Sequence, residues 1–199
     1  MSKRQICSGC DRPASVCLCS AISRVTPALQ LIIWQDKDEA RHRLSTAPLL
    51  HKSIVGSRLL VADQLVPEEL LGPDWRAQTM LLFPLEHKPA LTNEQLLDDQ
   101  GLPQRQQLLL LDGTWRKVKR LLLLNPWLNE LPHLALQPEQ TSRYAPVRKS
   151  PRDDGLSTLE AAVIALNQLH PQQDFTPVTR VLERLVYLQL QQRQQQSQQ

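Results

Sequence analysis

An acid, a hydroxyl and an indole follow one another closely at the end of the stretch 108–115, after a run of four leucines. The leucine run contains no glycine or proline and predicts a buried strand. It ends at Asp112, whose charge cannot enter an apolar core without a partner. Gly113 allows a sharp turn, and Thr114 can cap a helix that begins at Trp115. These groups should therefore lie at the carboxyl end of a strand, the edge where open α/β sheets bind ligands.

The cysteines are the second set of residues whose spacing indicates a chemical role. All four lie near the start of the chain, as Cys7, Cys10, Cys17 and Cys19, in the pattern C-x2-C-x6-C-x-C. Four thiolates can close a tetrahedral zinc site, which would be structural because no position is left for water. The segment has few apolar residues, so metal binding would supply its folding energy. The alternatives are four reduced surface thiols, or two disulfides formed on oxidation.

The elements that must position these groups alternate between strands and helices. Apolar runs predict strands at 28–34, 58–62, 79–84, 108–111 and 134–136. Caps, helical periodicity and breakers predict helices at 45–55, 92–97, 115–125, 157–166 and 178–191, with at most a short helix at 67–73 and a loop at 35–43. This alternation predicts an α/β fold with a mostly parallel sheet and flanking helices.

We expect three parts along the chain: a small N-terminal knuckle with the four cysteines at 1–24, an α/β domain at 25–190 and a Gln-rich tail at 191–199. The chain of 199 residues, 41% of them hydrophobic, is long enough for one domain with a core. The tail has low complexity, so we expect a frayed helix or a disordered end without chemistry.

Positive charge is concentrated in one part of the chain. The net charge is +3, but residues 105–152 hold nine Lys or Arg against three acids, a local balance of +6. A basic block around a candidate site favours an anionic partner such as RNA, and the alternative is a solvated surface. No stretch reaches the roughly 20 apolar residues that span a bilayer, and the first residues lack the apolar core of a secretion signal. We therefore expect a cytoplasmic protein without a membrane partner.

A loop and a helix start follow the basic block. The segment 141–155 contains two prolines, a glycine and four cations, which predicts an irregular loop. Ser157 and Glu160 after it have the spacing of a capping box. These two residues can serve only to start the helix, or they can also contribute to a ligand site.

Four segments resemble the motifs of one family. Asp112-Gly113-Thr114-Trp115 resembles the D-x-T-W signature of the DTW-domain proteins, which are tRNA-uridine aminocarboxypropyltransferases. The cysteine segment with Arg12-Pro13, the stretch 39–47, and the segments 143–148 and 156–161 are similar to the family's other motifs in the same order. The resemblance covers nearly the whole chain. One departure is Trp34-Gln35-Asp36, which stands where the family commonly has a His-Pro pair.

The resemblance implies that the 3-amino-3-carboxypropyl group of S-adenosylmethionine is transferred to N3 of a tRNA uridine, with methylthioadenosine released. It favours a uridine of the variable loop. It also implies a SPOUT-like α/β fold, a class that can contain a trefoil knot. The expected partner is tRNA, and no DNA partner is expected. The sequence leaves open which tRNAs are modified and what the oligomeric state is.

Roles for the candidate residues follow from this chemistry. Asp112 is the candidate general base for N3, and its alternatives are to hold the ligand's α-amino group or to cap the next helix. Trp115 is a candidate to stack on adenine or a flipped uridine, or to face the sulfonium, and its alternative is core packing. The cofactor-site candidates are Thr46, Thr114, Ser157, Thr158 and Glu160. The candidates for RNA binding are Arg116, Lys117, Lys119, Arg120, Arg143, Arg148, Lys149 and Arg152.

Two other functions fit parts of the pattern. A SPOUT-type methyltransferase would use the same co-substrate but release S-adenosylhomocysteine. A zinc-dependent RNA-binding module without catalysis would bind tRNA without binding S-adenosylmethionine. The by-product and the binding of the co-substrate distinguish these functions from aminocarboxypropyl transfer.

Overall fold

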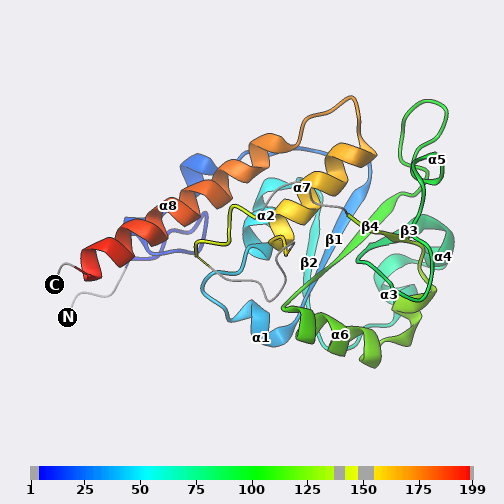
Figure 1. Ribbon diagram of the computed structural model, residues 1–199, viewed down its shortest axis with the longest axis horizontal. Coiled ribbons are helices and arrows are strands. Elements are labelled where there is room, and N and C mark those ends of the chain that lie inside the picture. The colour runs from blue at the N-terminus through cyan, green and yellow to red at the C-terminus, as the bar shows by residue number, and fades with distance from the viewer. Residues whose placement is uncertain (1–4, 137–141, 148–154, 198–199) are drawn as a thin grey trace.

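A five-stranded parallel sheet forms the centre of the molecule in the computed structural model, which describes residues 5–136, 142–147 and 155–197 (Figure 1). The strands are β1 (Gln30–Gln35), β2 (Arg58–Val61), β3 (Thr79–Leu82), β4 (Gln107–Asp112) and β5 (His133–Leu134). Their spatial order is β2-β1-β4-β3-β5, and every pairing is parallel. The carboxyl ends of the strands therefore meet at one edge.

Both faces of the sheet are buried, which explains why its central strands are apolar at nearly every position. One core receives Leu31, Ile33, Leu108 and Leu110, and the other receives Ile32, Trp34, Leu109 and Leu111. Neighbouring residues of a strand point to opposite faces, so an uninterrupted apolar run supplies both cores at once. The leucine run of β4 is thus a strand enclosed from both sides.

The helices divide between these two faces (Figure 1). The first core includes residues of α2 (Ala47–Ser53), α7 (Thr158–Leu169) and α8 (Thr179–Gln196). The second includes residues of α3 (Pro67–Leu71), α4 (Trp75–Gln78) and α6 (Trp115–Leu124). After the adjacent strands β1 and β4 the chain thus supplies helices to opposite faces. Such a reversal leaves room for a ligand between the strand ends.

Shorter helical segments complete the fold. These are α1 (Lys37–Ala40), α5 (Asn93–Leu96) and the 3-10 turns Ala14–Val16, Cys19–Ala21, Pro126–Glu130 and Thr176–Val178. Trp127 of the third turn stacks on Trp34 with 5.9 Å between ring centroids, and it meets the edge of Trp75 at 5.4 Å. These rings join the turn to β1 and α4.

The predicted α/β architecture with a parallel sheet is confirmed, and two helices differ from expectation. The expected loop at 35–43 contains α1, because the carboxylate of Asp36 accepts the N–H groups of Asp38 at 2.9 Å and Glu39 at 3.2 Å. Helix α4 was not anticipated, and burial of Trp75 anchors it. The Gln-rich end is helical as far as Gln196, because it continues α8.

The N-terminal cysteine segment packs against the rest of the molecule. Cys10 and Leu18 are buried within the first core, and Asp11 forms an ion pair with Lys52 of α2 at 2.9 Å. None of the helices in the described part of the chain is long and apolar enough to cross a membrane. The expected knot stays a prediction, because the path through 137–141 and 148–154 lies outside the described residues.

Candidate functional site

The site begins where β4 ends beside β1. Gln35 and Asp112 are register partners at the ends of these two strands. The backbone N–H of Asp36 donates to the carbonyl of Asp112 at 2.9 Å, so the pairing extends one residue past β1. The parallel register thereby sets a polar residue of β1 beside the acid of the Asp-Gly-Thr-Trp segment.

A buried hydrogen-bond network holds the Asp112 carboxylate, which belongs to a residue only 3% exposed. The amide nitrogen of Gln35 donates to Asp112 Oδ2 and to Ser45 Oγ, both at 2.7 Å. The hydroxyl of Thr158 donates to Asp112 Oδ1. The network therefore connects the ends of β1 and β4 with the segments that begin α2 and α7.

The turn after Asp112 is tight because two elements approach it. A Cβ on Gly113 would lie 3.1 Å from Lys117 Cβ and 3.5 Å from Asp36 Cβ. A side chain at this position would require Lys117 to shift by a few tenths of an ångström, so glycine suits the close packing. Thr114 is the N-cap of α6, where its hydroxyl accepts the backbone N–H of Lys117 at 3.4 Å. The predicted cap is confirmed, and the cap of α6 is therefore not Asp112.

A cavity of about 210 Å³ opens next to this turn. Its wall includes Phe83, Gly113, Trp115 and Thr158, together with leucines of β3 and β4. Trp115 is half-buried, and its ring lies 5.6 Å from that of Phe83 at an angle of 49°. The indole thus forms part of a cavity wall, and Thr158 joins this cavity to Asp112.

Ser157 and Glu160 form the capping box predicted for α7. The Glu160 carboxylate also accepts the Ser142 hydroxyl at 2.6 Å and the backbone N–H of Arg143 at 2.7 Å. Glu160 is 7% exposed, so these donors compensate the burial of its charge. Glu160 therefore anchors the described segment 142–147 to the start of α7.

Thr46, the remaining cofactor-site candidate, is the N-cap residue of α2. It is buried, and its side chain makes no capping hydrogen bond. Its neighbour Ser45 belongs to the network around Asp112. The structure thus brings Asp112, Trp115, Thr158 and the start of α2 to one edge of the sheet.

Two of the predicted RNA-binding cations on α6 are engaged by acids. Lys117 Nζ lies 3.1 Å from a carboxylate oxygen of Glu39 and 3.8 Å from one of Asp36. Arg120 pairs with Asp36 at 3.2 Å and with Asp63 at 3.1 Å. Asp36 and Glu39 follow β1 and are at most 1% exposed, so their charges need partners. The salt bridges to Lys117 and Arg120 therefore hold α6 against this segment.

The other predicted cations are placed differently. Arg116 and Lys119 are exposed and form no ion pair within the part of the chain that is described. Arg143 pairs with Glu183 of α8. Arg148, Lys149 and Arg152 lie outside the described residues.

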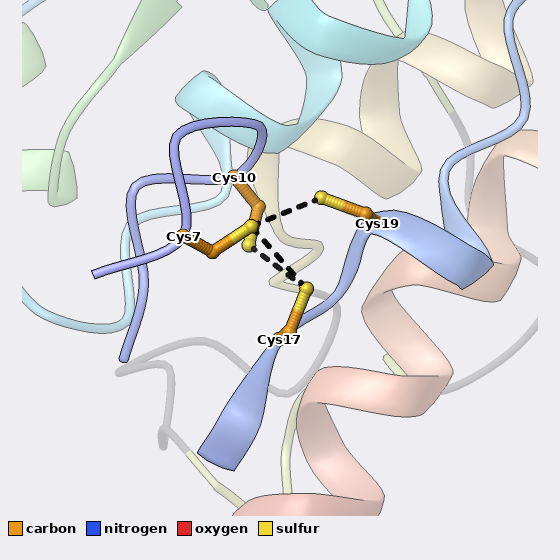
Figure 2. A group of neighbouring side chains, drawn as sticks. All are labelled: Cys7, Cys10, Cys17 and Cys19. Atoms are coloured by element: carbon orange, nitrogen blue, oxygen red, sulfur yellow. Dashed lines mark hydrogen bonds between the residues drawn. The ribbon is translucent and has the colours of Figure 1, made fainter. Parts of the chain in front are cut away.

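The four cysteines converge on one point, as Figure 2 shows. Their sulfur atoms all lie within 4.8 Å of one another, with Cys7 3.5 Å from both Cys17 and Cys19. Metal–sulfur bonds of about 2.3 Å in a tetrahedron place sulfur atoms roughly 3.8 Å apart, close to the observed spacing. The cluster can therefore hold a metal ion.

The backbone around Cys7 supports thiolate formation at that residue, whereas hydrogen bonds with the thiols of Cys7 and Cys17 raise the pKa of Cys19 to about 12. Backbone N–H groups of Cys10 and Gly9 lower the pKa of Cys7 to about 6. A Cβ at Gly9 would lie 2.6 Å from the sulfur of Cys19, so only glycine fits there. The segment is shaped around its sulfur atoms, and a metal ion would complete it.

Sequence reasoning missed Gln35, Ser45 and Phe83. Gln35 is the last residue of an apolar strand, as Asp112 is. A polar residue at that position is the feature of the sequence that could have indicated a place in the site. Recognising it requires the knowledge that β1 and β4 are neighbours, which their separation of 77 residues along the chain does not reveal. For Phe83 the sequence predicts only a place at the end of the strand 79–84.

Comparison with known proteins places the chain in a family. The model of the DTW domain matches residues 4–190. The chain is 31% identical over 133 residues to "tRNA-uridine aminocarboxypropyltransferase A" of Arabidopsis thaliana, covering 60% of this chain and 50% of the relative. It is 30% identical over 173 residues to "tRNA-uridine aminocarboxypropyltransferase 2" of Drosophila melanogaster, covering 83% and 66%.

A mouse relative with the same name is 30% identical over 175 residues, covering 84% of this chain and 57% of the relative. The chain thus spans about half to two thirds of the length of the curated relatives it matches. No solved structure matches the chain. The domain model, however, covers all of the residues that build the cavity, the network and the cysteine cluster, and the chain belongs to the DTW-domain family.

Proposed function

We propose that the protein transfers the 3-amino-3-carboxypropyl group of S-adenosylmethionine to N3 of a tRNA uridine, in the variable loop, and releases methylthioadenosine. The names of the relatives support tRNA-uridine aminocarboxypropyl transfer. The observation that carries the proposal to this chain is the cavity beside Asp112. Its wall combines Trp115 of the Asp-Gly-Thr-Trp segment with Thr158 of the segment 156–161, which resembles a second motif of the family.

The cavity suits a nucleobase. At about 210 Å³ it is smaller than the roughly 300 Å³ at which sites for drug-sized ligands begin. It therefore holds one ring system, while the rest of a nucleoside extends outside. The half-buried indole of Trp115 and the ring of Phe83 offer flat surfaces on which a base can stack. Trp115 thus serves to position a base.

Asp112 is the proton acceptor in this proposal, and Thr158 links it to the cavity. The Thr158 hydroxyl lines the cavity and donates to Asp112 Oδ1. When the Thr158 hydroxyl accepts the N3 proton of the uridine, the proton already on that hydroxyl passes to the Asp112 carboxylate. S-adenosylmethionine supplies a γ carbon activated by its sulfonium. N3 bonds to that carbon, the carbon–sulfur bond breaks, and its electron pair stays on sulfur.

The start of α7 is the proposed place for the α-carboxylate of the transferred group. Ser157 is the N-cap of this helix of 12 residues, and the N-terminus of a helix favours a negative charge. Thr158 is the first residue of α7, which sets the carboxylate near the cavity. Glu160 supports this place by fixing the segment in front of the helix.

Zinc is the metal that the four-cysteine set fits best, because soft thiolates in a closed tetrahedral set are typical of structural zinc. The ion would hold the N-terminal segment on α2 and α8 and would take no part in group transfer. Thiolates persist in a reducing compartment, so we also propose a cytoplasmic location.

Mass spectrometry of nucleosides tests the proposed reaction. The protein is incubated with S-adenosylmethionine and an unmodified tRNA transcript, and the digest should contain 3-(3-amino-3-carboxypropyl)uridine, with methylthioadenosine as the by-product. Methylated nucleosides with S-adenosylhomocysteine would instead establish a methyltransferase. Binding of tRNA without calorimetric binding of S-adenosylmethionine would leave only an RNA-binding module.

Exchange of Thr158 tests the proposed path of the proton. Thr158→Ser keeps the hydroxyl and should retain most of kcat. Thr158→Val keeps the shape but removes the hydroxyl, and kcat should fall by roughly 10²-fold, within the range for general acid–base groups. The pH profile of kcat should change in the valine variant only. Equal activity of the two variants would exclude the hydroxyl from the path.

A further inference from the structure

A second, larger cavity of about 660 Å³ lies away from the Trp115 cavity, as a cleft between three segments distant in sequence. One wall is the cysteine segment around Arg12, another is the connection 40–45 in front of α2, and the third is the end of α8 from Gln189 to Gln196. Figure 1 shows the red end of α8 beside the blue N-terminal segment. We call this cavity the arginine–glutamine cleft.

The charged groups of the cleft are mainly cations. Arg12, Arg41 and Arg43 line it, and Asp11, the one acid among its described lining residues, pairs with Lys52 at 2.9 Å. Arg43 is exposed and has no ion-pair partner among residues 5–136, 142–147 and 155–197. Arg41 has one weak contact, 4.0 Å from Asp38, and its side chain is 84% exposed. The cleft therefore offers positive charge that its own acids do not neutralise.

Arg12 contributes to this charge from a more enclosed position. Its guanidinium donates to the carbonyl of Arg43 at 3.3 Å, which holds the two residues together. Like charges held together favour an anion between them.

The α8 wall adds neutral hydrogen-bonding groups. Gln189, Gln192 and Gln196 line the cleft at spacings of three and four residues, so they share one face of the helix. Residues 185–197 contain no acid that would repel a polyanion. Arg193 donates to the carbonyls of Pro146 and Val147 at 2.8 and 2.9 Å and keeps this helix end in place. The Gln-rich end, which was expected to lack chemistry, is thus a wall with amide donors.

The inner end of the cleft adjoins the network around Asp112. Ser45 lines the cleft, and its hydroxyl oxygen accepts the Gln35 amide that also donates to Asp112. A chain lying in the cleft would therefore pass two hydrogen bonds away from the proposed proton acceptor. On α6, by comparison, Lys117 and Arg120 already pair with buried or half-buried acids. Arg116 and Lys119 of that helix are exposed and unpaired among the described residues, but they do not line the cleft.

We propose that the arginine–glutamine cleft binds the sugar–phosphate backbone of the tRNA substrate, an inference that rests on the proposed function. Arginine forks bind phosphate oxygens, and glutamine amides donate to phosphates and ribose hydroxyls. The cleft has a volume of about 660 Å³, and arginines from two of its walls line it, which suits a polyanion. The cleft thus holds the RNA while the Trp115 cavity receives a base.

Binding of an unmodified tRNA transcript to the full chain, measured over a series of salt concentrations, tests this inference. The variant Arg41→Gln/Arg43→Gln should bind roughly tenfold more weakly at low salt, because two phosphate contacts are lost. The slope of log affinity against log salt should become shallower by about 1.4 to 1.8. Both arginines are exposed, so the folded state should be kept, and the thermal midpoint checks this.

Two matched variants separate charge in the cleft from charge in general. Arg24→Gln/Arg180→Gln removes two exposed arginines that do not line the cleft, and it should leave affinity and slope as in the wild type. Arg41→Lys/Arg43→Lys keeps the charges, so the salt slope should stay as in the wild type, while the affinity should fall less than in the glutamine variant because only the fork geometry is lost. Unchanged affinity and slope in the cleft variant would overturn the inference, as would an equal loss in the Arg24/Arg180 variant.

The outcome is separable from that of the proposed reaction. If the modified nucleoside forms but the cleft variant binds tRNA normally, the reaction stands and the cleft assignment falls. If no modified nucleoside forms but the cleft variant loses tRNA binding, the cleft assignment stands without the reaction. A variant with weaker binding of S-adenosylmethionine and normal binding of tRNA would make the cleft part of the co-substrate site and overturn its assignment to RNA.

Discussion

The two hollows of the molecule differ in size and in chemistry. The cavity beside Trp115 is about 210 Å³ and is walled by aromatic and aliphatic groups with one hydroxyl from Thr158. The arginine–glutamine cleft is about 660 Å³ and is lined by cations and amides. A small apolar cavity selects a flat ring by shape, whereas a charged groove attracts a polyanion at a distance. On our proposals, the place where a base is selected is therefore separate from the place where the RNA backbone is held.

Cations in two regions of the molecule also differ in whether acids lie beside them. The basic block in the sequence drew attention to α6, yet Lys117 and Arg120 face Asp36, Glu39 and Asp63. Arg43, outside that block, has no such partner among the described residues. A local excess of cations in sequence therefore does not measure the charge available to a ligand. What matters is which acids the fold sets beside them.

Removal of the Asp112 carboxylate should have the largest effect on the rate of transfer. Asp112→Asn keeps the size of the side chain but removes its basic carboxylate, and kcat should fall by about 10²- to 10⁴-fold. Binding of tRNA should stay within roughly twofold, because the RNA is held elsewhere. Single-turnover rates and filter binding measure the two quantities. Full activity would reject the role of Asp112 as base, and a parallel loss of tRNA binding would break the proposed separation of the two hollows.

Loss of the indole should have the next largest effect. Trp115→Ala removes the aromatic wall, and kcat/KM should fall by roughly 5- to 150-fold, since stacking on one base contributes about 1–3 kcal/mol. Trp115→Phe keeps a ring and should lose much less. The affinity for tRNA at low salt should change less than in the cleft variant. If alanine and phenylalanine have equal effects, the ring does not stack on a base.

Removal of the metal should weaken tRNA binding by the cleft more than it weakens binding of S-adenosylmethionine. Cys17→Ser breaks the thiolate set, and zinc measured in the purified protein should fall from about one ion per chain towards none. Since Cys10 and Arg12 line the cleft, tRNA affinity should fall by roughly tenfold while binding of S-adenosylmethionine is kept. Ser8→Ala, an exposed change in the same segment, is the matched control. Unchanged tRNA binding after zinc loss would separate the cluster from the cleft.

The smallest effect is expected at the turn after Asp112. In Gly113→Ala the added methyl would lie 3.1 Å from Lys117 Cβ and would push α6 away from β1 by a few tenths of an ångström. The free energy of unfolding, measured in urea, should fall by about 1 kcal/mol. The rate of transfer should fall as well, because Trp115 moves with α6. A variant as stable and active as the wild type would show that the turn tolerates this shift.

Much of the local structure could be predicted from nearby residues. The leucine run of β4, the cap at Thr114, the capping box of Ser157 and Glu160, and the cysteine spacing are all patterns within a few positions of one another. Backbone propensity and capping act over that same distance, so these features can be predicted from the sequence alone. The family motifs pointed to Asp112, Trp115 and Thr158 for the same reason.

Tertiary structure alone decided which distant residues meet. Strand order placed Gln35 beside Asp112, and packing of α7 brought Thr158, 46 residues further on, to the other carboxylate oxygen. The fold also paired Lys117 with Glu39 and gathered Arg12, Arg43 and Gln192 around one cleft. The sequence by itself determined the elements and their caps, since these depend on neighbours along the chain. The site's partners depend on sheet order and helix packing, which minimise exposed apolar area over the whole molecule and are set by no single segment.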